Sequence, residues 1–228
     1  METASLPTCV GFIMDGNRRY ARERGEETVF GHVAGKDKLF EVVGWLRELQ
    51  IPHAAVYAFS TENWQRSSQE VEALITLFMV ALHELLQKTA AENVQIQFIG
   101  RRTDFSAELQ AEMEKVEQKS AQSAPQLTLW VALSYGGRAE MVAAVNEAIA
   151  QSVSVTEESF ERLLWSAGMP DIDVLIRTGG EHRLSNFLPW QTAYGELFFS
   201  DTYWPAFTKE EFTRILSDYA IRERRKGK

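Results

Sequence analysis

The sequence predicts a single-domain α/β protein with a mostly parallel central sheet of about six strands flanked by helices. Short runs rich in β-branched and aromatic residues alternate with longer segments of helical spacing, as in a sheet whose strands are joined by helices. The 228 residues, 45% of them hydrophobic, suffice for one sizeable core. No repeat, low-complexity segment or long linker divides the chain, so we expect one domain over residues 1–228.

Six runs are predicted as strands because they are short, apolar and bounded by turn residues. Three helix starts are also predicted: Ser67 with Glu70 and Thr208 with Glu211 have the form of a capping box. Thr156 precedes a periodic stretch that ends near Gly168. The predicted strands are Val10–Met14, Ala54–Phe59, Val94–Ile99, Leu127–Leu133, Asp173–Ile176 and Leu197–Phe199.

One predicted helix carries an apolar stripe over about four turns. Periodicity alone does not separate a core-facing stripe from the wall of an apolar tunnel, and core packing is the commoner case. The stripe comprises Val71, Leu74, Ile75, Phe78, Met79, Leu82, Leu85 and Leu86.

Composition excludes several functional classes. The 24 basic and 32 acidic residues give a formal net charge of −8, which argues against broad electrostatic binding to nucleic acid. The single cysteine, Cys9, leaves no intramolecular disulfide and no cysteine metal cluster, which fits a reducing compartment. No window reaches the roughly 18 apolar residues of a spanning helix, and the first residues lack a signal-peptide pattern. We expect a cytoplasmic protein that could still touch a membrane.

Polar and basic side chains follow four of the predicted strands. Residues 173–187 combine Arg177, Arg183, two glycines, a histidine and a serine after an apolar run. Arginine forks and glycine backbones are suited to gripping phosphate. Further clusters occupy residues 15–19, 60–66 and 134–138. Because ligands of parallel sheets bind at the carboxyl ends of strands, we expect these clusters to meet.

The triplet Asp15-Gly16-Asn17 lies where a strand passes into a helix. It is either an ordinary turn and cap, or a diphosphate site in which Asp15 binds Mg²⁺. Arg19 and His32 favour the second interpretation, because both could face the same anion from neighbouring helices.

Five motifs, in order, resemble those of the cis-prenyltransferases, the family of undecaprenyl diphosphate synthase. The similarity extends from about Leu6 to Gly227. It implies a homodimeric, Mg²⁺-dependent enzyme that condenses isopentenyl diphosphate with an allylic diphosphate in cis geometry. The product would be a polyprenyl diphosphate, held in an apolar tunnel between sheet and helices. The motifs are Ile13–Ala21, Gly31-His32 with Gly35, Tyr57–Trp64 with Arg66, Tyr135–Arg138 and Asp173–Phe187.

The resemblance also implies roles for individual residues. Asp15 would bind the metal ion, with Glu196 as a further candidate ligand near a dimer interface. The proton acceptor stays open among a diphosphate oxygen, Asn17 and Ser60. Candidates for catalysis are Asp15, Asn17, Ser60 and Asn63; for the allylic diphosphate Gly16, Asn17, Arg18, Arg19 and His32; for isopentenyl diphosphate Arg66, Arg177, Arg183 and Ser185; and for support Glu62, Trp64, Glu181, His182, Arg225 and Gly227.

Several positions depart from the family pattern. Thr28 replaces a common arginine, and losing one charged phosphate contact costs about 1.5–3 kcal/mol unless Arg18 compensates. Cys9 replaces a common histidine, and Ser67 a common proline. In the fourth strand Trp130 and Leu133 are bulky and would stop elongation early if they faced the tunnel. A core role for Trp130 is an equal alternative, because strand register is not fixed by the pattern.

Product length therefore stays open at this stage. A short-chain or irregular coupling enzyme on the same fold, or a non-catalytic accessory subunit, are the alternatives. The presence of Asn17, Asn63, Glu62 and His182 favours ordinary elongation. Asp15 and the phosphate-binding arginines argue against an accessory subunit, which could dispense with them.

Overall fold

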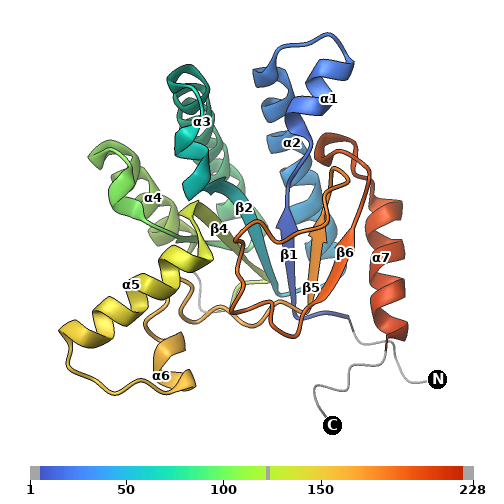
Figure 1. The fold of residues 1–228 in the computed structure, drawn as a ribbon. Coiled ribbons are helices and arrows are strands. Elements are labelled where there is room, and N and C mark those ends of the chain that lie inside the picture. The colour runs from blue at the N-terminus through green and yellow to red at the C-terminus, as the bar shows by residue number, and fades with distance from the viewer. Residues whose placement is uncertain (1–5, 122–123, 223–228) are drawn as a thin grey trace.

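The computed structural model describes residues 6–121 and 124–222, with residues 85–92 as backbone only. Its sheet has the strand order β3-β4-β2-β1-β5-β6, and every neighbouring pair is parallel (Figure 1). All six predicted strands are confirmed, with ends that shift by one or two residues. They are β1 Cys9–Ile13, β2 His53–Ser60, β3 Val94–Ile99, β4 Leu127–Tyr135, β5 Val174–Arg177 and β6 Glu196–Phe199.

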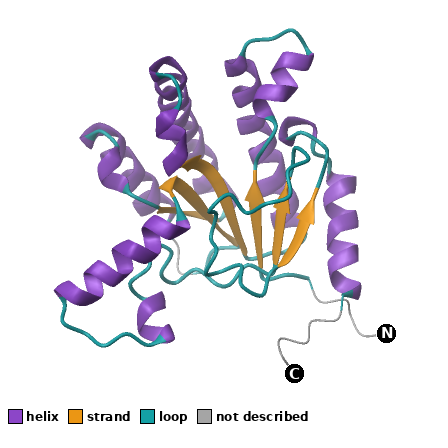
Figure 2. Ribbon diagram, viewed as in Figure 1, coloured by secondary structure: helices purple, strands orange, loops and turns teal. Residues whose placement is uncertain are grey.

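Helices and a long loop cover the two faces of the sheet (Figure 2). One face packs against α2, α3, α4 and α7. The opposite face packs against residues 184–188, near α5 and α6. The helices are α1 Asn17–Glu23, α2 Thr28–Glu48, α3 Ser68–Glu92, α4 Ala107–Ser120, α5 Gly137–Ala150, α6 Glu157–Glu161 and α7 Lys209–Ile221, with short 3₁₀ helices η1 Thr61–Gln65, η2 Arg102–Asp104 and η3 Trp204–Ala206.

The predicted helix starts are confirmed by their caps. The hydroxyls of Ser67 and Thr208 accept hydrogen bonds from backbone N–H groups three residues later, at 3.3 and 3.2 Å. Thr156 caps α6, but that helix ends at Glu161, so the prediction of a helical stretch to Gly168 is wrong. The following turns use i→i−3 bonds, from Leu163 to Phe160 onward, which place Phe160 and Leu164 in one buried cluster.

Strand alternation in β4 decides which side chains face the α2–α3 layer. Leu129, Val131 and Leu133 pack into the core on that side, whereas Trp130 and Ala132 pack on the opposite face. Trp130 is therefore a core residue of the other layer. Within the described part of the chain, no helix combines the length and apolar character needed to cross a membrane.

Candidate active site

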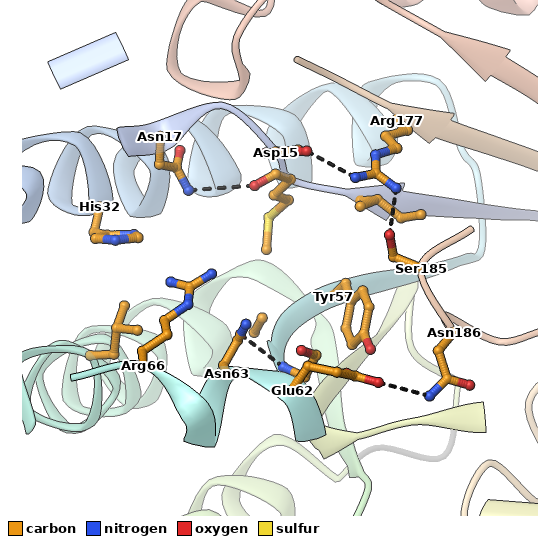
Figure 3. Close-up of a pocket in the computed structure, with 15 residues that line it drawn as sticks. Asp15, Asn17, His32, Tyr57, Glu62, Asn63, Arg66, Arg177, Ser185 and Asn186 are labelled. Atoms are coloured by element: carbon orange, nitrogen blue, oxygen red, sulfur yellow. Dashed lines mark hydrogen bonds and ion pairs between the residues drawn. The ribbon is translucent and has the colours of Figure 1, made fainter. Parts of the chain in front are cut away.

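A polar pocket of about 530 Å³ lies at the carboxyl ends of β1, β2 and β5 (Figure 3). The expected meeting of three strand-end clusters is thereby confirmed. The fourth cluster, residues 134–138, does not line this pocket. The lining residues are Ile13, Met14, Asp15, Asn17, His32, Tyr57, Ala58, Ser60, Glu62, Asn63, Arg66, Leu74, Arg177, Ser185 and Asn186.

Asp15 is held between two arginines at the turn from β1 to α1. Its Oδ2 accepts a bond from Arg177 Nη2 at 2.9 Å, and its Oδ1 accepts bonds from Arg19 Nη2 at 3.2 Å and the Gly16 N–H at 2.6 Å. Gly16 has φ +106°, and a Cβ there would lie 2.7–2.9 Å from atoms of Tyr203. Only glycine fits this turn, which fixes the carboxylate at the pocket.

Arg177 is the buried centre of this network, with 5% of its side chain exposed. Its Nη1 donates to the backbone oxygen of Arg183 at 2.6 Å and to Ser185 Oγ at 2.7 Å. The predicted pair Arg177 and Ser185 is thus brought together with Asp15, which lies 162 positions before Arg177 in the sequence.

Asn17 and His32 each present a buried polar atom without a hydrogen-bond partner, Oδ1 and Nε2 respectively. Both residues line the pocket. Burial, with the charges of Arg66 and Arg18, lowers the pKa of His32 to about 4, against an opposing effect of Glu70. His32 is therefore neutral at pH 7, and both side chains are available to hydrogen-bond a ligand.

The segment after β2 forms η1 along one wall. Asn63 Oδ1 accepts the Ser60 N–H at 3.0 Å, which closes a capping box. Glu62 Oε1 accepts a bond from Asn186 Nδ2 at 3.2 Å. Burial alone would raise the pKa of Glu62, but hydrogen bonds from its own N–H, from Asn186 and from neighbouring hydroxyls lower it overall. Glu62 is thus an ionised, weakly basic carboxylate.

Trp64 belongs to this segment but does not line the pocket. Its Nε1 donates to Ser134 Oγ at 2.8 Å, and its ring meets Phe59 edge-on at 5.0 Å. The contacts of Trp64 with Ser134 on β4 and Phe59 on β2 therefore hold η1 against the sheet.

A second hollow of about 690 Å³ adjoins the first on the α1 side. Arg18, Arg19 and Thr28 line it together with Arg66. Arg18 thus lines the same hollow as Thr28, which its suggested compensation for the arginine absent at position 28 requires. Glu70 contacts Arg66 at 2.9 Å and Arg18 at 3.7 Å.

Two residues of the site are not predicted from the sequence. The capping-box pattern predicts only a capping role for Glu70, although its spacing four residues after Arg66 indicates a helical ion pair. Asn186, which joins Glu62 to the backbone N–H of Arg138, has no local signal.

Other predicted residues lie outside the pocket lining. Arg183 has 59% of its side chain exposed and pairs with Glu181 at 2.5 Å. His182 stacks on Phe199 with ring centroids 4.8 Å apart. Arg225 and Gly227 fall outside the described residues.

Glu196 does not share the Asp15 site. It begins β6 opposite Val174, whereas Phe199 lies opposite Arg177, so Glu196 occupies the other end of the sheet. Its carboxylate pairs with Arg222 at 2.5 Å. Within one chain Glu196 and Asp15 therefore lie at opposite ends of the sheet, and a metal-binding role of Glu196 near a dimer interface stays a prediction.

An apolar cavity of about 110 Å³ continues from the polar pocket. The two share Met14, Asn17, His32, Ala58 and Leu74. Within the α3 stripe, Leu74, Phe78 and Leu82 line this cavity, whereas Val71, Ile75 and Met79 pack against the core only. The side chains of Leu85 and Leu86 lie outside the described residues. Leu133 reaches the cavity and Trp130 does not. The residues of α3 that line the cavity are Leu74, Leu77, Phe78, Ala81 and Leu82.

Comparisons with known proteins agree with this geometry. A family model of undecaprenyl diphosphate synthases matches residues 13–227. An isoprenyl transferase of Aquifex pyrophilus is 43% identical over 98% of this chain and 96% of its own. A tritrans,polycis-undecaprenyl-diphosphate synthase (geranylgeranyl-diphosphate specific) of Thermococcus kodakarensis is 40% identical over 100% of this chain and 89% of its own.

Two crystal structures share the fold over 98% of this chain and 99% of theirs. One is a probable undecaprenyl diphosphate synthase from Campylobacter jejuni, with 32% identity and a TM-score of 0.84. The other is lavandulyl diphosphate synthase from Lavandula x intermedia in complex with dimethylallyl diphosphate, with 27% identity and a TM-score of 0.89. The chain belongs to the undecaprenyl diphosphate synthase family of cis-prenyltransferases.

Proposed function

We propose that this chain condenses isopentenyl diphosphate with an allylic prenyl diphosphate in cis geometry, making a polyprenyl diphosphate and releasing diphosphate. One observation carries the proposal: an arginine-rich pocket opens directly into an apolar cavity. Such a site matches a substrate with an anionic head and a hydrocarbon tail.

The allylic diphosphate is assigned to the α1 side. Arg19 and Arg18 would meet its negative charge, and the unpartnered Nε2 of His32 would hydrogen-bond it. When the allylic C–O bond breaks, the electron pair leaves with diphosphate, and these donors stabilise the developing charge. Asn17, at the junction of pocket and cavity, would orient the reacting end.

Isopentenyl diphosphate is assigned to the β5 side, where Arg177 and Ser185 lie together. Arg66 lines both hollows and would serve either head group. The isopentenyl double bond attacks the allylic C1, and a proton leaves C2. Ser60, Asn17 and a diphosphate oxygen remain the candidate acceptors, because the lowered pKa of Glu62 makes it a poor base.

Mg²⁺ is the cofactor we propose. Among the described residues no three potential ligands of the His, Cys, Asp and Glu type cluster together. The pocket-lining carboxylate of Asp15 nevertheless fits the usual mode in which one or two carboxylates and substrate phosphates hold Mg²⁺. When bound, the ion would stabilise charge on the leaving diphosphate.

We also propose a homodimer. The exposed side chains of Val142, Val145 and Ile149 form an apolar stripe along α5, which supports burial against a second copy. The family resemblance assigns Arg225 and Gly227, which lie outside the described residues, to the function of a dimer. We further propose a cytoplasmic enzyme that touches the membrane peripherally when it releases its product. The exposed side chains of Val29 and Phe30 at the start of α2 support this contact.

The test uses purified protein, Mg²⁺, labelled isopentenyl diphosphate and allylic diphosphates of increasing length. Products are identified by mass spectrometry, and their double-bond geometry by NMR. Cis products are expected, and Asp15→Ala should reduce turnover by several orders of magnitude. Unchanged turnover in Asp15→Ala would contradict the catalytic assignment. Head-to-middle products, or none, would revive irregular coupling or the accessory role.

A further inference from the structure

We propose that Lys36 and Glu84 limit the length of the prenyl product by tying α2 to α3 beside the apolar cavity. The inference rests on the proposed function and deepens it, because it assigns a specificity role to two residues outside the polar pocket.

Lys36 is the charged residue among the described side chains that line the cavity. The other polar lining residues, Asn17 and His32, lie at the end shared with the polar pocket. Lys36 follows His32 by one helical turn, about 6 Å along α2. A hydrocarbon chain that grows away from the diphosphate along α2 therefore meets Lys36 early.

The ammonium group of Lys36 is fixed by carboxylates. Its Nζ lies 2.7 and 2.6 Å from the two oxygens of Glu84 on α3, and 3.1 Å from Asp37. The Lys36 side chain is 14% exposed and that of Glu84 is 34% exposed. The pair therefore joins two helices at a partly buried position, where charges are held more firmly than on an open surface.

The cavity must enlarge before a long product fits. Its volume of about 110 Å³ is below the roughly 150 Å³ of a cavity that holds one benzene. Its floor consists of Phe98, Leu129, Val131 and Leu133, which are buried on the paired strands β3 and β4. Moving that floor would disturb a hydrogen-bonded sheet, whereas parting α2 from α3 requires breaking the Lys36–Glu84 pair.

A growing chain is opposed by this pair in two ways. The tie resists separation of the helices, and a hydrocarbon tail passing it would remove water from two charged groups. Once the tail reaches Lys36, release of the product is therefore favoured over further elongation. Removing the charge should let the tail pass between the helices.

The full-length protein is assayed with Mg²⁺, an allylic diphosphate and excess isopentenyl diphosphate, and product lengths are measured by mass spectrometry. Lys36→Met keeps an apolar stem without the charge, and Glu84→Gln keeps the shape of its partner. Each should lengthen the main product by at least one isopentenyl unit. Lys38→Met is the matched control, because Lys38 pairs with Glu41 within α2 and does not line the cavity.

Unchanged lengths in Lys36→Met or in Glu84→Gln would overturn the tie, as would an equal lengthening in Lys38→Met. If one of the two variants fails to fold, the other decides. Failure of the proposed function is a different result, since the unaltered protein would then incorporate no isopentenyl unit at all, and the inference would fall with it.

Discussion

Replacing Arg177 by methionine tests the central assignment of the polar pocket. The change removes three hydrogen bonds of the guanidinium group, to Asp15, to Ser185 Oγ and to the Arg183 backbone oxygen. Methionine retains much of the buried apolar stem, so the lost charge and hydrogen bonds dominate the effect.

Two magnitudes follow. A lost charged contact to a substrate phosphate costs about 1.5–3 kcal/mol, which raises KM for isopentenyl diphosphate roughly 10- to 150-fold. Asp15 keeps its bonds to Arg19 and Gly16, so no carboxylate is left unpaired and the unfolding free energy falls by only about 1–3 kcal/mol. For a chain of this size, each kcal/mol lowers Tm by roughly 2–4 °C.

Arg183→Met is the comparison, measured by steady-state kinetics and thermal unfolding. Arg183 is exposed and pairs with Glu181, so its loss should leave Tm unchanged within about 1 °C. Any rise in its KM would come from a substrate contact formed on binding. If Arg177→Met kept both its KM and its Tm, the reasoning from its buried network would be refuted.

Three further predictions concern pH, product length and the metal ion. The pKa of His32 is about 4 in the folded state against an ordinary 6.5, so the unfolded state binds the proton first as pH falls. The free energy of unfolding should therefore fall by roughly 3 kcal/mol between about pH 6.5 and about pH 4, and urea titrations of His32→Gln should no longer show that loss. Leu133→Ala should lengthen the product because Leu133 lines the cavity, whereas Trp130→Ala should lower stability by about 3–5 kcal/mol without changing length; a length change in Trp130→Ala alone would reverse the assignment. Chelation by EDTA should abolish turnover, reversibly with Mg²⁺, but leave Tm unshifted, and a large drop in Tm would indicate a structural metal ion instead.

The sheet and the meeting of its strand ends could be predicted from sequence because both depend on local patterns. Apolar runs bounded by turns gave all six strands, and parallel strands bring their carboxyl ends to one edge by geometry. Asp15, Arg177 and Ser185 were grouped correctly for this reason.

Features that depend on strand register, or on contacts between residues distant in sequence, could not be predicted from the sequence. A shift of one residue exchanges the two faces of a strand, so Trp130 and Leu133 could not be assigned until β4 was paired. The position of Glu196 relative to Asp15 could not be read from its motif, because Glu196 begins β6 and so lies at the end of the sheet away from Asp15. The bond between Glu62 and Asn186 spans 124 positions, and no periodic pattern encodes such a contact.

The charges of the pocket explain why a divalent cation is expected despite so many arginines. Three arginines of the site already face a carboxylate of the chain: Asp15 pairs with Arg19 and Arg177, and Glu70 pairs with Arg66. These cations are therefore largely neutralised before substrate binds, in a chain whose net charge is −8. Two diphosphates bring more negative charge than the site can meet without either releasing the carboxylates or gaining a cation beside Asp15. A cation beside Asp15 would compensate the charge of the carboxylate. It would thereby free Arg19 and Arg177 to turn toward phosphate.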